Sequence, residues 1–181
     1  FLMILRPSLS TLFPSSTLFR SLIRHYSLSL ADRLEIELRR RNHNRLGFAI
    51  QLCLMRYQGR VLGAEETPPR AMLKYVADQI GAAPGEFALY ARREETRRDH
   101  MARLMVYLNT RSATLQDRRV ALLAAVQAAT MSDDGAAIAS SIVAALRERG
   151  ALLPAIDTIE RIGLAGRAIA RRRAERTLIE D

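Results

Sequence analysis

The residues of this sequence with the clearest chemical potential are arginines, which gather with threonine and histidine in two short segments. A guanidinium group is planar and always charged, and its fork of N–H donors matches both a phosphate and the edge of a guanine. Segments of this kind can therefore contact a nucleic acid. The first contains Arg92, Arg93, Thr96, Arg97, Arg98 and His100, and the second contains Thr158 and Arg161.

The spacings that catalysis or metal binding requires are absent from the sequence. The three histidines lie apart from Cys53, the only cysteine, and neither an H-E-x-x-H nor a C-x-x-C pattern occurs. A glycine-rich phosphate loop and a G-x-S-x-G nucleophile turn are missing as well. Asp133 and Asp134 stand where a helix is expected to start, and capping explains them without a metal ion. We therefore predict no catalytic residue, no metal and no cofactor.

The charge of the chain favours a polyanionic partner. Its 181 residues include 28 Lys and Arg against 19 Asp and Glu, which gives a formal net charge of +9 at pH 7. Clustered cations gain affinity for nucleic acids by releasing the counterions that are condensed on the phosphates. No apolar run approaches the ~20 residues that span a bilayer, so we expect no membrane association.

Apolar residues recur at helical spacing along most of the chain, and glycine and proline are few. Residues 46–57 are apolar almost throughout, which is typical of a helix in the middle of a bundle. Asn44 is expected to cap this central helix and Gly59 to end it, whereas Ser29 and Asp32 resemble a capping box that starts an earlier helix. We predict an all-α fold, a multi-helix bundle whose other helices cover about residues 30–41, 69–80, 84–90, 91–109, 115–131 and 138–149, with a last one from about 155.

The predicted helices group into two small helix-turn-helix-like lobes, residues 25–110 and 115–181, joined by a polar segment at residues 111–114. Each lobe contains two helices joined by a tight, glycine-containing turn, and the second helix of such a pair enters the major groove of DNA with its first residues. Residues 1–24 contain no acid and are rich in serine. We interpret them as a disordered or non-native leader, with an organelle transit peptide as the alternative.

Each basic segment also has a second interpretation. On a helix Arg93, Arg97 and His100 share one face, and this face can contact DNA. Glu94 can instead pair with neighbouring arginines on a solvated, salt-bridged helix. The arginines between residues 167 and 176 form either a phosphate clamp or the solvated end of a long helix. The residues themselves leave both pairs of alternatives open.

Several motifs, in this order, resemble the amino-terminal DNA-binding region of replicative transposases of the Tn-three family. The resemblance extends from about residue 25 to about residue 176, and residues 1–21 fall outside it. Its motifs are Asn44-Arg45-Leu46-Gly47-Phe48-Ala49, Gln51-Leu52-Cys53, Arg56-Tyr57, Gly59-Arg60, Tyr90-Ala91-Arg92-Arg93-Glu94-Glu95-Thr96-Arg97-Arg98 with His100, Leu152-Leu153-Pro154-Ala155, and the run from Thr158 to Arg161.

The resemblance implies binding of duplex DNA at the terminal inverted repeats of a transposon, through the arginine, threonine and histidine residues named above. In such transposases the cutting is done by a distant Asp-Asp-Glu domain, and no residue of this chain matches it. The resemblance also implies a bacterial, cytoplasmic protein that acts at the nucleoid, and it allows a homodimer of the full-length protein. The alternative is a helical protein–protein interaction module whose basic surface only aids solubility.

Overall fold

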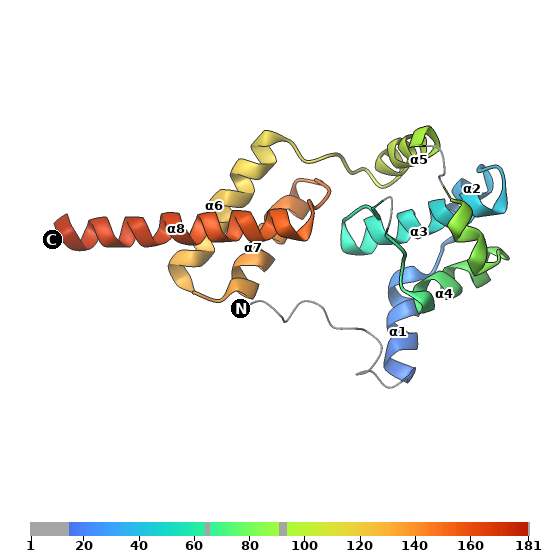
Figure 1. Cartoon of the computed structure of the whole chain (residues 1–181), viewed down its shortest axis with the longest axis horizontal. Helices are drawn as coiled ribbons and strands as arrows, with labels where there is room; N and C mark the ends of the chain where they lie inside the picture. The colour runs from blue at the N-terminus through green and yellow to red at the C-terminus, as the bar shows by residue number, and fades with distance from the viewer. Residues whose placement is uncertain (1–14, 64–65, 91–93, 181) are drawn as a thin grey trace. The chain divides into compact units, whose positions relative to one another are not determined.

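Every regular element in the described part of the chain is a helix (Figure 1). The computed structural model of the protein describes residues 15–63, 66–90 and 94–180. Over these residues the elements are α1 (Ser15–Tyr26), α2 (Leu30–Glu37), α3 (Asn42–Gln58), α4 (Arg70–Ile80), the 3-10 helix η1 (Pro84–Leu89), α5 (Glu94–Tyr107), α6 (Leu115–Met131), α7 (Gly135–Glu148) and α8 (Ile156–Glu180). The predicted all-α fold class is confirmed. None of these helices combines the length and the apolar character needed to cross a membrane.

The chain divides into two compact units. Unit 1 comprises residues 1–53 and 62–97, and unit 2 comprises residues 54–61 and 98–181. Helices α3 and α5 each contribute residues to both units, and the chain also changes unit between residues 61 and 62, after α3 has ended. The two DNA-binding lobes inferred from the sequence remain a prediction about function.

Helix α3 supplies the centre of unit 1, as its apolar sequence predicted. Phe48, Ile50 and Leu52 are completely buried on it. The helix begins at Asn42, and the backbone carbonyl of Arg41 accepts the first helical hydrogen bonds, so the predicted cap at Asn44 is wrong. Gly59 follows the helix with a φ of 72°, a conformation that suits glycine and ends the helix as predicted.

Helix α1 packs against α4 and places Leu22 and Tyr26 in the core of unit 1. Residues 15–24 are therefore helical, whereas the sequence suggested a disordered leader there, and residues 1–14 lie outside the described residues. The lack of acidic residues suggested disorder, although the segment has an apolar helical face. The helix is stable only when this face packs against α4.

The short elements of unit 1 follow local capping signals. Ser29 and Asp32 form the expected capping box: the Ser29 amide donates to the Asp32 carboxylate at 2.8 Å, and the Asp32 amide donates to Ser29 Oγ at 3.2 Å. Helix η1 starts at the predicted Pro84, although it has 3-10 rather than α geometry. The second member of the first predicted helix-turn-helix pair is thus a six-residue 3-10 helix.

In unit 2, α6 packs against both α7 and α8 (Figure 1). Gly166 on α8 allows a close crossing, because a Cβ at that position would lie only 2.6 Å from the Cβ of Ala125 on α6. Asp134 caps α7 as predicted, since its carboxylate accepts from the amides of Ala136 and Ala137. The buried cluster of this unit consists of Ala121, Ala125, Ile138, Ile142, Leu146 and Ala151.

Candidate nucleic-acid interface

The first predicted site lies before and within α5, and its residues differ in accessibility. Arg92 and Arg93 lie outside the described residues. Thr96 is half-buried, whereas Arg98 is exposed and its side chain forms no hydrogen bond or ion pair with any residue that the structure describes. Arg98 is therefore the described residue of this segment that can most readily reach a phosphate.

Arg97 and His100 turn toward the protein instead. The Arg97 guanidinium donates to the backbone carbonyl of Leu62. The Gln51 side chain binds the same residue: its Nε2 donates to the Leu62 carbonyl at 3.3 Å, and its Oε1 accepts from the Leu62 amide at 3.0 Å. His100 is only 5% exposed. Arg97 thus has a structural role in unit 1, where it fastens the start of α5 to the segment after α3.

The packing next to Arg97 explains one glycine of the family motif. The Tyr90 ring lies against Gly47, so closely that a Cβ at this position would overlap the ring. Burial raises the pKa of Tyr90 to about 12, and the positive charge of Arg97 opposes this shift. Tyr90 therefore remains protonated at physiological pH, and Gly47 is needed for the close approach of its ring.

The second predicted site lies on the first turns of α8, where the structure brings Thr158 and Arg161 together. Arg161 is exposed and Thr158 is half-buried. The Arg161 guanidinium donates to Thr158 Oγ1 at 3.2 Å and to the carbonyl of Asp157 at 3.3 Å. Both contacts are local and solvent-exposed, and a guanidinium has five N–H donors. Arg161 therefore retains donors for a ligand while its position on the helix is defined.

The buried carboxylate of Asp117 joins three segments of unit 2, and the sequence-based interpretation missed this role. Arg111 donates to it at 2.5 and 2.9 Å, and Arg149 donates at 2.6 Å. The amide and hydroxyl of Thr114 also donate, both at 2.7 Å. These hydrogen bonds, from Arg111 first, hold the pKa of Asp117 well below its usual range. The T-x-x-D pattern of residues 114–117 was the available signal, because it marks a capping box.

The same contacts hold the turn between α7 and α8. Arg111 forms a parallel backbone bridge with Ala151, in which its amide donates to the Gly150 carbonyl at 3.0 Å and its carbonyl accepts from the Leu152 amide at 2.9 Å. The Leu153 amide donates to the Gly59 carbonyl at 2.8 Å. The segment that we interpreted as a polar linker is therefore anchored, and it supports the turn that leads into α8.

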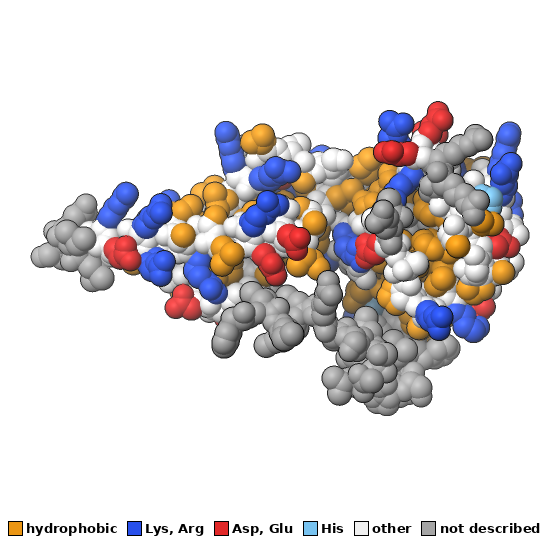
Figure 2. All heavy atoms as spheres, in the orientation of Figure 1, with side chains coloured by type: hydrophobic (Ala, Val, Ile, Leu, Met, Phe, Trp, Pro, Cys, Tyr) orange, Lys and Arg blue, Asp and Glu red, His pale blue; other side chains and the backbone are white. Residues whose placement is uncertain are grey.

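Basic side chains continue along α8 beyond the predicted site. Between residues 161 and 177, Glu175 is the only acidic residue. Figure 2 shows Lys and Arg side chains spaced along this helix, with fewer acidic ones between them. The described residues contain no group of three or more His, Cys, Asp or Glu that could hold a metal ion. The arginines along α8 carry positive charge and N–H donors, which suit them to binding anions.

Comparison with known proteins assigns the chain to a family. Residues 9–165 match the family described as Domain of unknown function (DUF4158). The chain belongs to this family. The matched region of this DUF4158 domain includes α1 and the first half of α8, so it contains both predicted sites.

The DUF4158 domain is also similar to part of several bacterial transposases. It is 37% identical over 159 residues to the transposase for transposon Tn21 of Escherichia coli, and 36% identical over 159 residues to that for Tn501 of Pseudomonas aeruginosa. The transposase for Tn1546 of Enterococcus faecium is 30% identical over 154 residues. These matches cover 85 to 88% of this chain but only 16% of each transposase. The predicted resemblance to transposases is confirmed, and the chain is related to a small part of such proteins.

Proposed function

We propose that this chain recognises the terminal inverted repeats of a transposon as duplex DNA, and that a different part of the transposase performs the catalysis. The observation that carries the proposal is the start of α8, where Thr158 and exposed Arg161 follow a turn anchored through Arg111 and Asp117. The similarity to transposases supports DNA as the ligand, because a transposase has to find the ends of its element.

In this proposal the first turns of α8 enter the major groove. Arg161 then donates two hydrogen bonds to the O6 and N7 of a guanine, which is the commonest sequence-specific contact of this kind in that groove. Exposed Arg98 contributes a phosphate contact, which orients the protein without reading sequence. The partner is duplex DNA at the transposon ends. The proposal includes action at the bacterial nucleoid and a homodimer of the full-length transposase.

The test is binding of the 181-residue chain to an inverted-repeat duplex and to a scrambled duplex of equal length, measured by fluorescence anisotropy. Arg161→Ala should weaken binding to the repeat by ~1–3 kcal/mol and reduce the discrimination between the duplexes. Arg119→Ala, which removes an exposed arginine from α6, is the matched control and should retain the discrimination. Equal affinity of the unaltered chain for both duplexes would contradict the proposal.

A second candidate function, a helical protein–protein interaction module, is favoured by exposed apolar side chains in unit 2. Leu123, Met131 and Leu164 are 57%, 87% and 61% exposed. Such side chains suit a protein partner better than they suit DNA. This candidate predicts self-association in sedimentation experiments and no complex with labelled duplex in the presence of competitor DNA.

A further inference from the structure

Residues 171–177 of α8 form a helical arm without protein cover in the described structure. Every residue from 171 to 177 is exposed, whereas Gly166 and Ala170 earlier in the helix are buried. A helix that is polar on all sides gains little stability from packing, so this arm depends on its continuity with the buried half. Its surface is therefore available to a partner, and its composition determines which kind.

The arginines of this arm retain their donors. The side chains of Arg171, Arg172, Arg173 and Arg176 form no hydrogen bond or ion pair with any described residue, although Glu175 lies among them. Arg167 differs, because its guanidinium donates to the Asp133 carbonyl at 2.5 Å. Within the described part of the chain the arm thus offers several guanidinium groups that no other side chain binds, which is the chemistry of a phosphate-binding surface.

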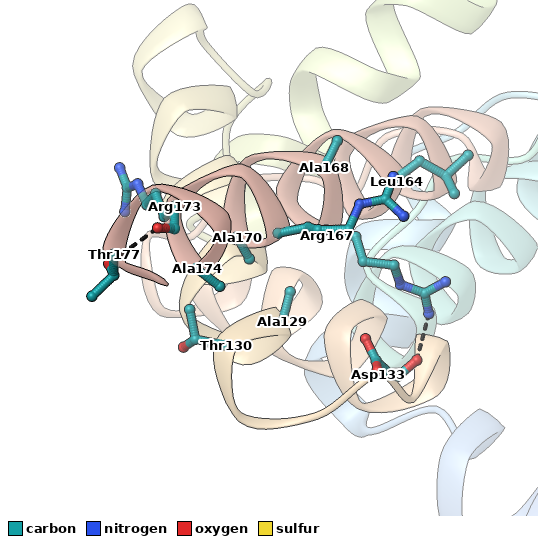
Figure 3. Close-up of a pocket in the computed structure, with 11 residues that line it drawn as sticks. Ala129, Thr130, Asp133, Leu164, Arg167, Ala168, Ala170, Arg173, Ala174 and Thr177 are labelled. Carbon is teal, nitrogen blue, oxygen red and sulfur yellow. Dashed lines mark hydrogen bonds between the residues drawn. The ribbon is translucent and has the colours of Figure 1, made fainter. Parts of the chain in front are cut away.

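The arginines of this arm differ in their angle around the helix from Arg161 and in whether they line a groove beside α6. At about 100° per residue, Arg172 lies only about 20° around the helix from Arg161, and Arg176 lies about 60° from it. Arg171 lies about 80° to one side of Arg161 and Arg173 about 120° to the other side, and both line a groove of about 620 Å³ between the end of α6 and α8. Figure 3 shows Arg167 crossing from α8 to Asp133 in this groove. We call Arg161, Arg172 and Arg176 the outer face, and Arg171 and Arg173 the groove face.

The distance along α8 from Arg161 to Arg172 is long enough to reach from the floor of the major groove to the phosphates at its edge. Arg172 follows Arg161 by eleven positions, which is about 16.5 Å at 1.5 Å per residue. The major groove of B-DNA is about 12 Å wide. With Arg161 at the base edges, Arg172 and Arg176 therefore lie beyond the groove, at the height of the flanking sugar-phosphate backbone.

We propose that Arg172 and Arg176 bind backbone phosphates of the duplex whose bases Arg161 reads. This inference rests on the proposed function and deepens it, because it assigns sequence-independent affinity to one face of the α8 arm. The occupant is duplex DNA, chosen because unpaired guanidinium groups in line with Arg161 complement regularly spaced phosphates. The groove face does not take part in this contact.

The experiment compares two double variants with equal charge loss on the same helix: Arg172→Gln with Arg176→Gln, and Arg171→Gln with Arg173→Gln. Glutamine has nearly the helix propensity of arginine and all four residues are exposed, so the melting temperature of each variant should match that of the unaltered chain. Affinity for the inverted-repeat and scrambled duplexes is measured across a series of salt concentrations.

The outer-face pair should reduce the slope of log K against log salt by about 0.9 for each lost phosphate contact, with unchanged discrimination between the duplexes. The groove-face pair should retain the slope of the unaltered chain. An unchanged slope in the outer-face pair, or equal loss in both pairs, would overturn this inference while leaving the proposed function intact. If the unaltered chain does not discriminate between the duplexes, the proposed function fails and the inference fails with it.

Discussion

At the scale of single residues, Asp117 connects several segments of unit 2, although the sequence did not single it out. Its carboxylate is buried and receives hydrogen bonds from Arg111, Arg149 and Thr114, so both of its oxygens are used. A buried carboxylate is costly unless it is paired in this way. Asp117 thus connects the start of α6 to the segment before it and to the end of α7.

Asp117→Asn should lower the melting temperature of unit 2 at neutral pH, because it removes the charge that both arginines bind. The folded-state pKa of Asp117 is depressed below its ordinary value of 3.8, so the stability that it contributes is present above that value and is lost as the pH falls below it. The difference in melting temperature between variant and unaltered chain should therefore shrink in acid. Thermal unfolding followed by circular dichroism from pH 7 to pH 2 measures this, and the change is expected below pH 3.8.

Asp78→Asn is the control for that series. Asp78 pairs with Lys74 at 2.7 Å, but both side chains are exposed, and pairs of this kind contribute about 0–1 kcal/mol. Its melting temperature should stay close to that of the unaltered chain. A difference for Asp117→Asn that remains constant with pH would show that the Asp117 carboxylate is not a charged anchor.

The contact made by Arg97 could not be predicted from residue types and their spacing. The sequence placed it with Arg93 and His100 on one helical face for DNA, and helical spacing supports that grouping. The structure directs its guanidinium to the carbonyl of Leu62, 35 residues earlier in the chain. No local pattern encodes that contact, because it depends on where α3 ends and where the following segment runs.

At the scale of helices, the crossing of α6 and α8 depends on Gly166. A Cβ at Gly166 would approach the Ala125 Cβ at 2.6 Å and the Ala125 backbone carbon at 2.9 Å, and backbone cannot move aside cheaply. Gly166→Ala should therefore destabilise the protein by about 1–3 kcal/mol through overpacking. Urea unfolding monitored by circular dichroism measures the change in the free energy of unfolding.

Gly163→Ala provides the matched control on the same helix. A Cβ at Gly163 meets only Ile138 Cγ2 at 3.6 Å and Ile142 Cδ1 at 3.9 Å, which are ordinary contacts. Because glycine lowers helix stability relative to alanine by roughly 0.5–1 kcal/mol, this variant should be as stable as the unaltered chain or more stable. Destabilisation of both variants to the same extent would mean that the close crossing is not specific to Gly166.

Helix limits were predictable where the signals are local. Helix α6 covers Leu115–Met131 as expected, because Thr114 caps its start and the polar residues after Met131 interrupt it. Helix α1 was missed, since its burial depends on α4, about 50 residues later in the chain. The 3-10 geometry of η1 was also not evident, because proline at the first position suits an α-helix equally well.

At the scale of the whole molecule, the net charge of +9 should produce strong, sequence-independent attraction to DNA. Affinity for the scrambled duplex should fall steeply between about 50 and 200 mM salt, with a log-log slope of about 0.9 for each phosphate contact. Discrimination in favour of the inverted repeat should persist across this range, because base contacts release few counterions. Anisotropy titrations at four or more salt concentrations measure both quantities.

If the affinity for either duplex did not change with salt concentration, an interface dominated by phosphate contacts would be contradicted. A bovine albumin titration at the same ionic strengths serves as the control for the signal change of the labelled DNA alone.

The total charge could be read from the composition, whereas the number of arginines that can contact phosphates could not. Arg97, Arg111 and Arg149 are engaged within the protein, and only the tertiary structure distinguishes them from Arg98, Arg172 and Arg176, whose side chains bind none of the described residues.

The sequence by itself determined the all-helical class, most helix limits, the Ser29 and Asp134 caps and the relationship to transposases. These features follow from periodicity, capping patterns and ordered motifs, all of which act within a few residues along the chain. Tertiary structure alone decided that Arg97 binds Leu62, that Asp117 gathers Arg111 and Arg149, and that α8 leaves an exposed arginine arm. The physical reason is range: a helix forms from hydrogen bonds between near neighbours, whereas the partner of a guanidinium is set by packing between distant segments.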